Sequence, residues 1–443
     1  MQNRHTRVIL VLLTSLVLAG SLIIYNISQS DAQPMIIIES DNIGSYRAVN
    51  ASTGETVFAS TNKSYVQEQT VNSLLNTSGI IYMNKNMWNH SLNIPTDLVV
   101  EENDLVVKEN YQGDKTIYYN IQNINNGLTN IFGFAIQTSP DTITYFYRQG
   151  TTHAQDKGDI VMRPYTISSG TWSDASIVYS DPILDSRNAA GGIINDKIYL
   201  FFYRYNYTTG SAKGSDVGYI VSTDLTGSSW SAYIPLINNT EASPYGTLVQ
   251  KGQSTTWFLG YYATNCNISK IKLITSKDNG ETWAIKNTVY NGTTHYAEPA
   301  LTYLGDDRML ILAREEINGP LHQFTSTDGG VTWIDSGATN IGTNITNRSN
   351  IPSIQVNGNM LYVLWADRGM AKMMLSKSNV NVFYDPSLYD TPNEIGYMKN
   401  IDSINKAGYP SIVILNNGDL FYVYGNAIND YIVDISSGII KLS

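Results

Sequence analysis

The ionisable residues with the most informative spacing stand at the two ends of one 17-residue segment. Glu298 opens this segment and Arg314 closes it, with apolar runs on either side of a central Gly305-Asp306-Asp307 turn. The pattern predicts a β-hairpin, whose first and last residues lie side by side at the end away from the turn, its mouth. A carboxylate and a guanidinium there could form a structural ion pair or belong to a site. Tyr409 opens a similar segment. It could belong to a site or be an ordinary packing residue in a chain with 31 tyrosines.

Other catalytic and cofactor chemistries have no signature in the sequence. The five histidines are scattered and show no H-x-x-x-H spacing, so a metal enzyme is not expected. Cys266 is the single cysteine, which excludes an intramolecular disulfide framework. No glycine-rich phosphate loop and no G-x-S-x-G elbow is present, and we expect no cofactor. With 28 basic and 38 acidic residues, a net charge of -10 and no basic tract, nucleic acid is not an expected partner.

The hairpin pattern recurs six times and predicts the fold. Each copy has an apolar strand, a turn near its middle and a second apolar strand, and successive copies start 53 to 58 residues apart. Six units of four short strands predict an all-β fold, a six-bladed β-propeller, over residues 126–443. The six copies are Phe132–Arg148, Asn188–Arg204, Ser243–Tyr262, Glu298–Arg314, Ile351–Asp367 and Tyr409–Gly425.

A second repeated motif reads S-x-D-x-G-x-T-W. Ser276–Trp283 and Ser326–Trp333 are near-copies 50 residues apart, and Ser222–Trp230 is a looser third copy. The aspartate can accept backbone N–H bonds inside a turn, the glycine can take positive φ, and the tryptophan can pack beneath. Because the motif follows each hairpin by one strand, it should lie on the face opposite the hairpin mouths. We therefore expect structural roles for Asp278, Trp283, Asp328 and Trp333, and chemistry at the mouths.

The first 32 residues indicate export. Basic residues precede an apolar run from Val8 to Ile24, which at about 1.5 Å per residue approaches the ~30 Å thickness of a hydrocarbon core. Ser30 and Ala32 suit cleavage before Gln33, so residues 1–32 are either a signal peptide or an N-terminal hydrophobic helix that anchors the chain in the membrane. The expected location is extracellular or at the cell surface, and N-x-S/T sequons beyond residue 33 are compatible with a glycoprotein.

Residues 33–125 form a separate region in the sequence. Short apolar runs there predict strands, with one short helix at 66–75. We expect a small β-rich spacer domain that holds the propeller away from the membrane.

The S-x-D-x-G-x-T-W motifs, on a period of roughly fifty residues, resemble the Asp-box (BNR) repeats of sialidases. The segments Ala297–Leu301 and Ile311–Glu316, followed by such a motif, are similar to one blade of the non-viral sialidases. The resemblance covers roughly residues 130–443 and implies a sialidase-like six-bladed propeller. It also implies an exo-glycosidase that acts on terminal acidic sugars of glycans. Asp boxes also occur in non-enzymatic propellers, so the alternative is a non-catalytic glycan-binding or cell-envelope structural propeller with a degenerate site.

The resemblance assigns roles to residues near the hairpin mouths. Tyr409 matches the family's nucleophile, and Glu298 matches the glutamate that takes its proton. Asp156 and Asp159 follow the first hairpin, where the family's acid/base aspartate belongs. The family grips a substrate carboxylate with three arginines, whose planar forks donate two parallel hydrogen bonds. The candidates for these substrate-binding positions are Arg314, Arg187, Arg348 and Arg368.

One stretch departs from the family pattern. The family's first arginine stands in an Arg-Ile-Pro motif that opens the first hairpin, whereas this chain reads Asn130-Ile131-Phe132-Gly133-Phe134. Arg187 could serve from one blade over, or the site could bind another ligand. We therefore expect weak activity on simple sialosides and consider other acidic sugars as substrates.

Overall fold

The computed structural model describes part of the chain. The described residues are 35–40, 46–50, 56–60, 79–83, 98–101, 104–107, 118–124, 126–153, 156–208, 214–238, 240, 242–265, 268–315, 319–341, 351–368, 372–397, 408–427 and 432–440. The expected signal or anchor segment and the expected helix at 66–75 lie outside these ranges. Within them, no helix has the length and apolar character needed to cross a membrane.

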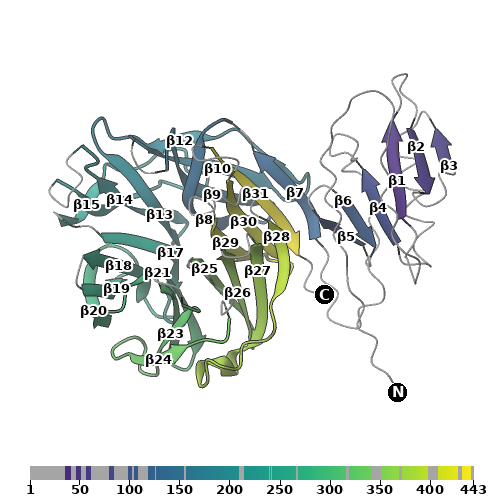
Figure 1. Ribbon diagram of the computed structural model, residues 1–443. Helices are drawn as coiled ribbons and strands as arrows, with labels where there is room; N and C mark the ends of the chain where they lie inside the picture. Colours follow the sequence, from purple (N-terminus) through teal and green to yellow (C-terminus); the bar gives the residue numbers. More distant parts are fainter. Residues whose placement is uncertain are drawn as a thin grey trace, which may run out of the picture.

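From residue 118 onward, the described strands form six blades around a central axis (Figure 1). Within each blade the strands pair antiparallel, from an inner strand outward. The inner strands β8, β13, β17, β21, β25 and β29 contact one another in a closed ring. The expected all-β, six-bladed propeller is confirmed, and each predicted hairpin forms the first two strands of a blade.

The strand bounds of the six blades are as follows. Blade one has β8 (Thr129–Ser139), β9 (Thr142–Gly150), β10 (Asp159–Thr166) and the short outer strands β11 (Thr171–Trp172) and β12 (Ser176–Tyr179), and blade two has β13 (Asp185–Ile194), β14 (Lys197–Tyr205), β15 (Asp216–Val221) and β16 (Ile234–Asn238). Blade three has β17 (Ala242–Gln250), β18 (Trp257–Asn265), β19 (Ile268–Ser276) and β20 (Ala284–Gly292), and blade four has β21 (Tyr296–Gly305), β22 (Arg308–Glu315), β23 (His322–Ser326) and β24 (Ile334–Ala338). Blade five has β25 (Ile351–Asn357), β26 (Met360–Asp367), β27 (Lys372–Asn379) and β28 (Asn393–Tyr397), with the 3-10 helix η2 (Val380–Phe383) after β27, and blade six has β29 (Gly408–Ile414), β30 (Leu420–Ala427), β31 (Val433–Ile440) and β7 (Tyr118–Ile124).

Strand β7 (Tyr118–Ile124) closes the ring of blades, although its residues fall within the spacer expected at 33–125. It pairs antiparallel with β31, with Ile124 opposite Ile435 and Tyr118 opposite Ile440. Blade six draws only three described strands from the C-terminal end of the chain, so β31 would otherwise present an unpaired edge. The propeller therefore begins at β7, ahead of the boundary at residue 126 that the hairpin pattern predicts.

A separate sheet precedes the propeller. Its six strands have the order β3-β2-β1-β4-β6-β5, and β1 and β4 are parallel neighbours. It lies to the right of the propeller in Figure 1. Its role as a spacer stays a prediction. The strands are β1 (Met35–Ser40), β2 (Tyr46–Asn50), β3 (Thr56–Ser60), β4 (Gly79–Met83), β5 (Leu98–Glu101) and β6 (Asp104–Val107).

The Asp-box turns have the contacts that their sequence predicts. Asp278 accepts bonds from the backbone N–H of Thr282 at 2.9 Å and from its hydroxyl at 2.5 Å, which lower the pKa of the Asp278 carboxyl. The Trp283 indole N–H donates to the Gly280 carbonyl at 3.0 Å. In the second box, Asp328 accepts the corresponding bonds from Thr332. These interactions hold the two tight turns in place.

Two backbone hydrogen bonds place these turns on one face of the propeller. The Asn279 N–H donates to the Thr255 carbonyl at 3.1 Å, and the Gly329 N–H donates to the Asp307 carbonyl at 2.8 Å. Thr255 and Asp307 lie in the β17–β18 and β21–β22 hairpin turns. The Asp boxes thus lie on the face of the hairpin turns, opposite the mouths, as predicted.

The box tryptophans also pack between blades. Trp283 of blade three lies with its ring centroid 4.9 Å from that of Phe201 in blade two. Trp230 of blade two lies 6.0 Å from Phe146 in blade one. The indole N–H of Trp172 in blade one donates to the Ser437 hydroxyl in blade six at 3.0 Å. Each of these tryptophans therefore joins its blade to the preceding one.

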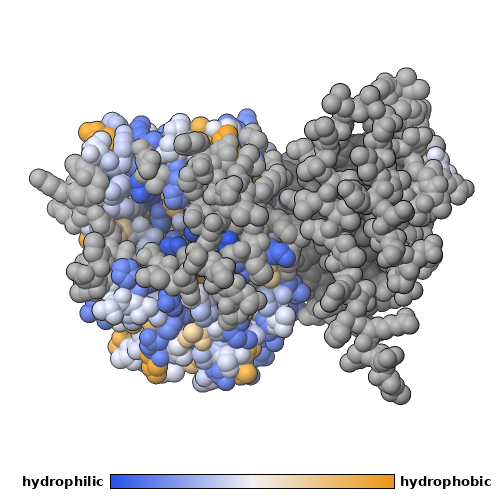
Figure 2. Space-filling view, viewed as in Figure 1, coloured by the Kyte–Doolittle hydropathy of each residue, from blue (hydrophilic) through white to orange (hydrophobic). Residues whose placement is uncertain are grey.

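The propeller face in view is largely hydrophilic, with hydrophobic residues in small separate spots (Figure 2). Isolated apolar residues on a surface are normal and do not by themselves mark an interface.

Candidate active site

A repeated backbone feature marks the hairpin mouths. Phe132, Asn188, Glu298 and Tyr409 all have positive φ, between 44 and 60°, at bulges in four inner strands. Gly246, with φ of 80°, lies in the corresponding bulge of β17. Bulky residues rarely adopt this conformation, and such strain clusters at functional sites. The bulges occur at the positions where sequence reasoning predicted chemistry.

Glu298 and Arg314 form an ion pair across the mouth of the fourth hairpin. Glu298 is only 2% exposed, and the Arg314 side chain is 13% exposed. The hairpin register sets Ala297 opposite Arg314, and the bulge that follows places Glu298 beside it. The ion pair anticipated from the sequence is therefore present, and it faces the neighbouring groups described next.

Tyr409 is buried beside this pair. Burial raises the pKa of the Tyr409 phenol and the negative Glu298 adds to the effect, whereas Arg368, Arg314 and a hydrogen bond with Arg368 act in the opposite direction. The Arg368 guanidinium carbon lies 5.4 Å from the Tyr409 ring centroid. Arg368 is itself buried, and this burial lowers the pKa of its guanidinium. Blades four, five and six thus bring a phenol, a carboxylate and two guanidiniums together near the axis.

Two more phenols border this cluster. Burial raises the pKa values of Tyr245 and Tyr262 well above the ordinary value, and Glu298 and Tyr409 add to the effect. The Tyr245 hydroxyl donates to the Pro352 carbonyl at 2.8 Å, and the Asn188 amide lies 3.4 Å from the Tyr262 hydroxyl. Sequence reasoning missed both, because the third hairpin has no charged residue at its ends.

An aromatic group occupies the first-blade mouth, where the family pattern has an arginine. The Phe132 ring meets the Tyr409 ring edge-on, with centroids 4.5 Å apart and an interplanar angle of 78°. It also contacts the ring of His153, with centroids 5.2 Å apart. The departure from the family motif therefore changes the chemistry of the site itself, since a neutral ring packs directly on the candidate nucleophile.

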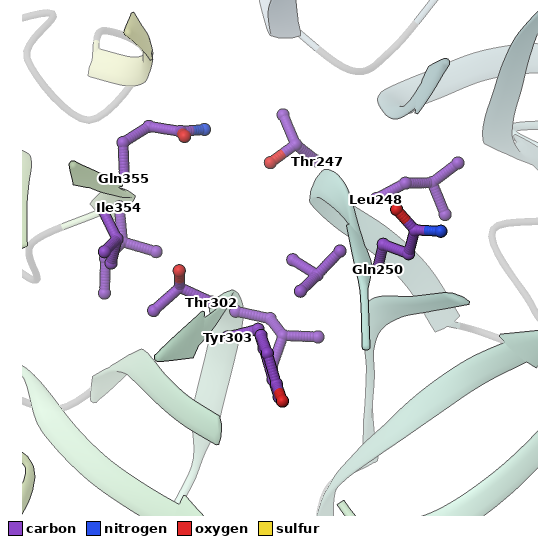
Figure 3. Close-up of a pocket in the computed structure, with 10 residues that line it drawn as sticks. Thr247, Leu248, Gln250, Thr302, Tyr303, Ile354 and Gln355 are labelled. Atoms are coloured by element: carbon purple, nitrogen blue, oxygen red, sulfur yellow. The ribbon is translucent and has the colours of Figure 1, made fainter. Parts of the chain in front are cut away.

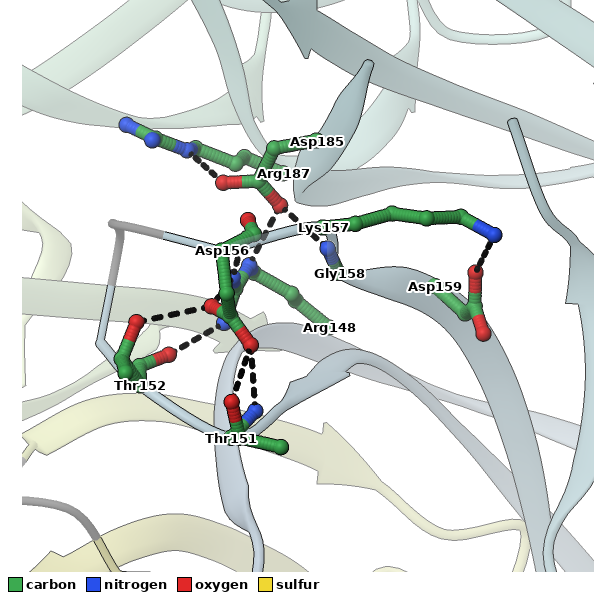
Figure 4. A network of polar contacts seen from close by, with 9 residues as sticks. All are labelled: Arg148, Thr151, Thr152, Asp156, Lys157, Gly158, Asp159, Asp185 and Arg187. Carbon is green, nitrogen blue, oxygen red and sulfur yellow. Dashed lines mark hydrogen bonds and ion pairs between the residues drawn. The ribbon is translucent and has the colours of Figure 1, made fainter. Parts of the chain in front are cut away.

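Asp156 stabilises the loop that follows β9 (Figure 4). Its carboxylate accepts bonds from Arg148 at 2.7 Å, from the hydroxyls of Thr151 and Thr152 at 2.8 Å each, and from the Thr151 N–H. Burial alone would raise its pKa, but these bonds from Thr152, Arg148 and Thr151 hold the pKa at about 2. Such a carboxylate stays ionised near neutral pH, whereas a general acid needs a proton to give.

Asp159, the other acid/base candidate, begins β10. Its carboxylate lies 3.8 Å from the Lys157 ammonium group, and Lys157 also donates to the Ser180 hydroxyl at 3.0 Å. In Figure 4, Asp159 and Lys157 turn away from the network around Asp156. This contact joins Asp159 to a residue two positions before it in the chain.

Arg187 belongs to a network between blades one and two. Its Nε donates to Asp185, and its guanidinium carbon lies 4.3 Å from the Tyr205 ring centroid. Asp185 is fully buried and also accepts from Arg148 at 2.7 Å and from the Gly158 N–H at 2.9 Å (Figure 4). Sequence reasoning missed Asp185, although it stands two positions before Arg187. Arg187 is thus oriented by this network, and Arg348 lies outside the described residues.

A cavity of about 270 Å³ lies between three inner strands (Figure 3). Its lining comes from Thr247–Gln250 of β17, Leu301–Tyr303 of β21 and Ile354–Val356 of β25, and contains no charged residue. These residues lie further along each strand toward the hairpin turns than the mouth cluster does. The ionisable cluster around Tyr409 therefore does not line this cavity. Within the described ranges, no three His, Cys, Asp or Glu residues are grouped so as to hold a metal ion.

The chain is similar to known propellers over this region. The family model for the BNR repeat-like domain matches residues 141–422. No curated protein matches the sequence. A protein of unknown function from Dyadobacter fermentans DSM 18053 has 16% identity and a TM-score of 0.60, over 73% of this chain and 99% of that one.

Two sialidases are also similar in structure. The Hadza microbial sialidase Hz136 has 15% identity and a TM-score of 0.56, over 70% of this chain and 65% of its own. The Trypanosoma rangeli sialidase has 15% identity and a TM-score of 0.54, over 70% of this chain and 55% of its own. The matched region thus spans less than two thirds of each sialidase. At these identities the likeness establishes a sialidase-like propeller fold.

Proposed function

The chain belongs to the BNR repeat-like domain family, and on this premise we propose that it is an extracellular glycoside hydrolase that releases a terminal acidic sugar from glycans. In this proposal Tyr409 is the nucleophile, Glu298 accepts its proton, and Arg314 and Arg368 bind the carboxylate of the sugar. Residues 1–32 would direct export as a signal peptide or retain the protein at the cell surface as a membrane anchor.

The convergence of Glu298, Arg314 and Arg368 on Tyr409 carries the proposal. Burial and the nearby carboxylate raise the pKa of the Tyr409 phenol, so the group is neutral near pH 7. A neutral phenol is not repelled by an anionic sugar, and Glu298 can take its proton as the bond to the sugar forms. The Arg314 guanidinium holds Glu298 in place through the ion pair.

The charges around Tyr409 support an acidic substrate. Of the charged groups that shift the pKa of its phenol most, two are guanidiniums and one is a carboxylate. The whole chain has a net charge of -10, so positive groups at the mouths contrast with the rest of the protein. Guanidinium forks match the geometry of a carboxylate.

Replacement of Tyr409 by phenylalanine tests the proposal. The substrates are aryl glycosides of sialic acid and of uronic acids. Loss of a nucleophile lowers the rate by several orders of magnitude, whereas loss of one neutral hydrogen bond costs only about 1 kcal/mol. Glu298→Gln should act similarly, and Tyr384→Phe, at a tyrosine that is 69% exposed, is the matched control. Turnover by Tyr409→Phe within tenfold of the wild type would contradict the nucleophile assignment.

A non-catalytic glycan-binding propeller is the second candidate. It is favoured by the hydrogen bonds that tie Asp156 to Arg148 and Thr152. These bonds give this acid/base candidate a structural role. On this alternative the wild type has no turnover, binds acidic glycans with an affinity that falls in Arg314→Lys, and barely responds to Tyr409→Phe. The affinity should fall in Arg314→Lys because lysine keeps the positive charge but lacks the bidentate fork of arginine.

A further inference from the structure

Cleavage of a glycosidic bond to an alcohol needs a proton donor for the leaving oxygen, and the contacts of the two expected aspartates do not single out either of them as that donor. Asp156 is held ionised by its hydrogen bonds, and Asp159 contacts Lys157. We propose that His153 is the general acid/base of this site. The inference rests on the proposed glycosidase function and adds a residue to it.

His153 lies on the loop that joins β9 and β10, and the network around Arg148 supports that loop. The Arg148 guanidinium is buried and donates to the Thr152 carbonyl at 2.7 Å. The Thr152 hydroxyl donates to Asp156 at 2.8 Å, and Asp156 in turn pairs with Arg148. The residue immediately before His153 is therefore fixed through both its backbone and its side chain. A supporting network of this kind is what precise positioning of a catalytic group requires.

Phe132 connects His153 to Tyr409. The Phe132 ring contacts both rings, with centroid distances of 5.2 Å to His153 and 4.5 Å to Tyr409. The two outer rings can thus be separated by no more than the sum of these distances. In retaining glycosidases the nucleophile and the acid flank the scissile bond, with carboxyl groups about 5–5.5 Å apart. The contacts with Phe132 set an upper limit of nearly twice that spacing on the separation of the two rings, so a sugar that reaches both groups must lie over the edge of the Phe132 ring.

The backbone of Phe132 explains why the ring is there. Its φ of 60° lies in a bulge where Ile131 pairs with Arg148 and Phe134 pairs with Phe146. Such a conformation is costly for a bulky residue and persists only when its surroundings enforce it. Phe132 is 8% exposed, and its ring contacts both the Tyr409 ring and the His153 ring.

The proposed reaction balances in two steps. In the first, the Tyr409 oxygen bonds to the anomeric carbon and its proton passes to Glu298. The bond from that carbon to the glycosidic oxygen breaks, and protonated His153 gives its proton to the departing oxygen. In the second, water attacks the anomeric carbon and gives a proton to neutral His153, while Tyr409 leaves the sugar and recovers its proton from Glu298. The net reaction consumes one water and cleaves one glycosidic bond.

Imidazole suits this cycle because it changes charge between about pH 5 and 8. Arg148 and Asp156 stand on either side of His153 in the chain and pair with each other. Beyond Phe132 lie Tyr409 and the charged groups that act on it, Glu298, Arg314 and Arg368. A histidine that alternates between charged and neutral forms can thus serve both steps at one site.

The test compares leaving groups in His153→Gln and His153→Ala. The probes are sialosides and uronides that carry either a dinitrophenolate, which departs without a proton, or a simple alkyl alcohol, which needs one. We expect kcat/KM for the alkyl glycosides, which reports the first step, to fall by about 10²–10⁴-fold, while kcat/KM for the dinitrophenyl glycosides stays within about threefold of the wild type. The kcat for the dinitrophenyl glycosides should fall, because the second step loses its base. The limb of the wild-type pH profile that falls as pH rises should be lost in both variants.

Parallel variants separate the possible failures. Equal losses of kcat/KM with both leaving groups would show that His153 only shapes the site. A leaving-group-dependent loss of kcat/KM in Asp159→Asn instead would place the acid at Asp159. Either result overturns the assignment. Tyr409→Phe should lose turnover with both leaving groups. If it keeps the dinitrophenyl activity, the assignment of Tyr409 as the nucleophile fails, whereas the comparison of leaving groups still tests His153 as the proton donor. No turnover of any probe by the wild type would overturn both.

Discussion

Replacement of Trp283 by alanine should weaken the contact between blades two and three. The Trp283 side chain is 9% exposed, and its ring centroid lies 4.9 Å from Phe201, 6.0 Å from Tyr199 and 6.4 Å from Tyr219. Its indole N–H donates to the Gly280 carbonyl. Truncation of a buried tryptophan to alanine costs about 3–5 kcal/mol. A value in this range is expected here because three rings of the neighbouring blade lose their partner.

The free energy of unfolding in urea measures this loss. The matched control is Val331→Ala in the second Asp box, since the Val331 side chain is 66% exposed and should change stability by less than about 0.5 kcal/mol. A double-mutant cycle with Phe201→Leu isolates the contact between blades, and a coupling of about 0.5–1.5 kcal/mol is expected for an edge-on aromatic pair.

Two results would refute this reasoning. A stability loss below about 1 kcal/mol for Trp283→Ala would mean that the indole is not an important contact between blades. Loss of glycan turnover or binding at unchanged stability would mean that the Asp box takes part in function, although it lies on the face opposite Tyr409.

Two further perturbations address the closure of the ring and the loop at Asp156. A chain that starts at residue 126 lacks β7 and leaves β31 as an open edge. It should therefore melt at a lower temperature and aggregate more than a chain that starts at residue 112. Equal melting temperatures would contradict closure by β7. The pKa of Asp156 is lowered to about 2, so its contribution to stability is present above an ordinary carboxyl pKa of about 4 and is lost as pH falls toward 2. Urea midpoints should therefore show a gap between the wild type and Asp156→Asn that is large at pH 7 and shrinks below about pH 3; a gap independent of pH would exclude an ionised Asp156 as its cause.

The blades could be predicted from sequence because their signals are local. A turn such as Asn357-Gly358-Asn359 and the apolar runs beside it lie within one hairpin, and the structure pairs Asn357 with Met360 there. Strand β7 carried no comparable signal. Its partner β31 lies more than 300 residues away, and an apolar run does not reveal which distant edge it will cover.

The site could be predicted in part for a similar reason. Glu298 and Arg314 are the two ends of one hairpin, so the sequence spacing alone brings them together. The contacts of Phe132 with Tyr409 and His153 join blade one to blade six, and no spacing within a repeat reports on them. Asp185 was missed because its partners lie in the preceding blade.

The bulges at the mouths explain how one repeated unit can hold several kinds of side chain. The same left-handed conformation presents phenylalanine, asparagine, glutamate and tyrosine from four blades, and glycine occurs in the third. In the described part of the inner strand of blade five, Ile351 to Asn357 pair in unbroken register with β26 and form no such bulge. Each strained residue costs of order 1–3 kcal/mol, which the packing between blades must offset. The repeat therefore fixes the backbone at each mouth while the side chain is free to differ, and one conformation presents the Phe132 ring, the Glu298 carboxylate and the Tyr409 phenol from three blades.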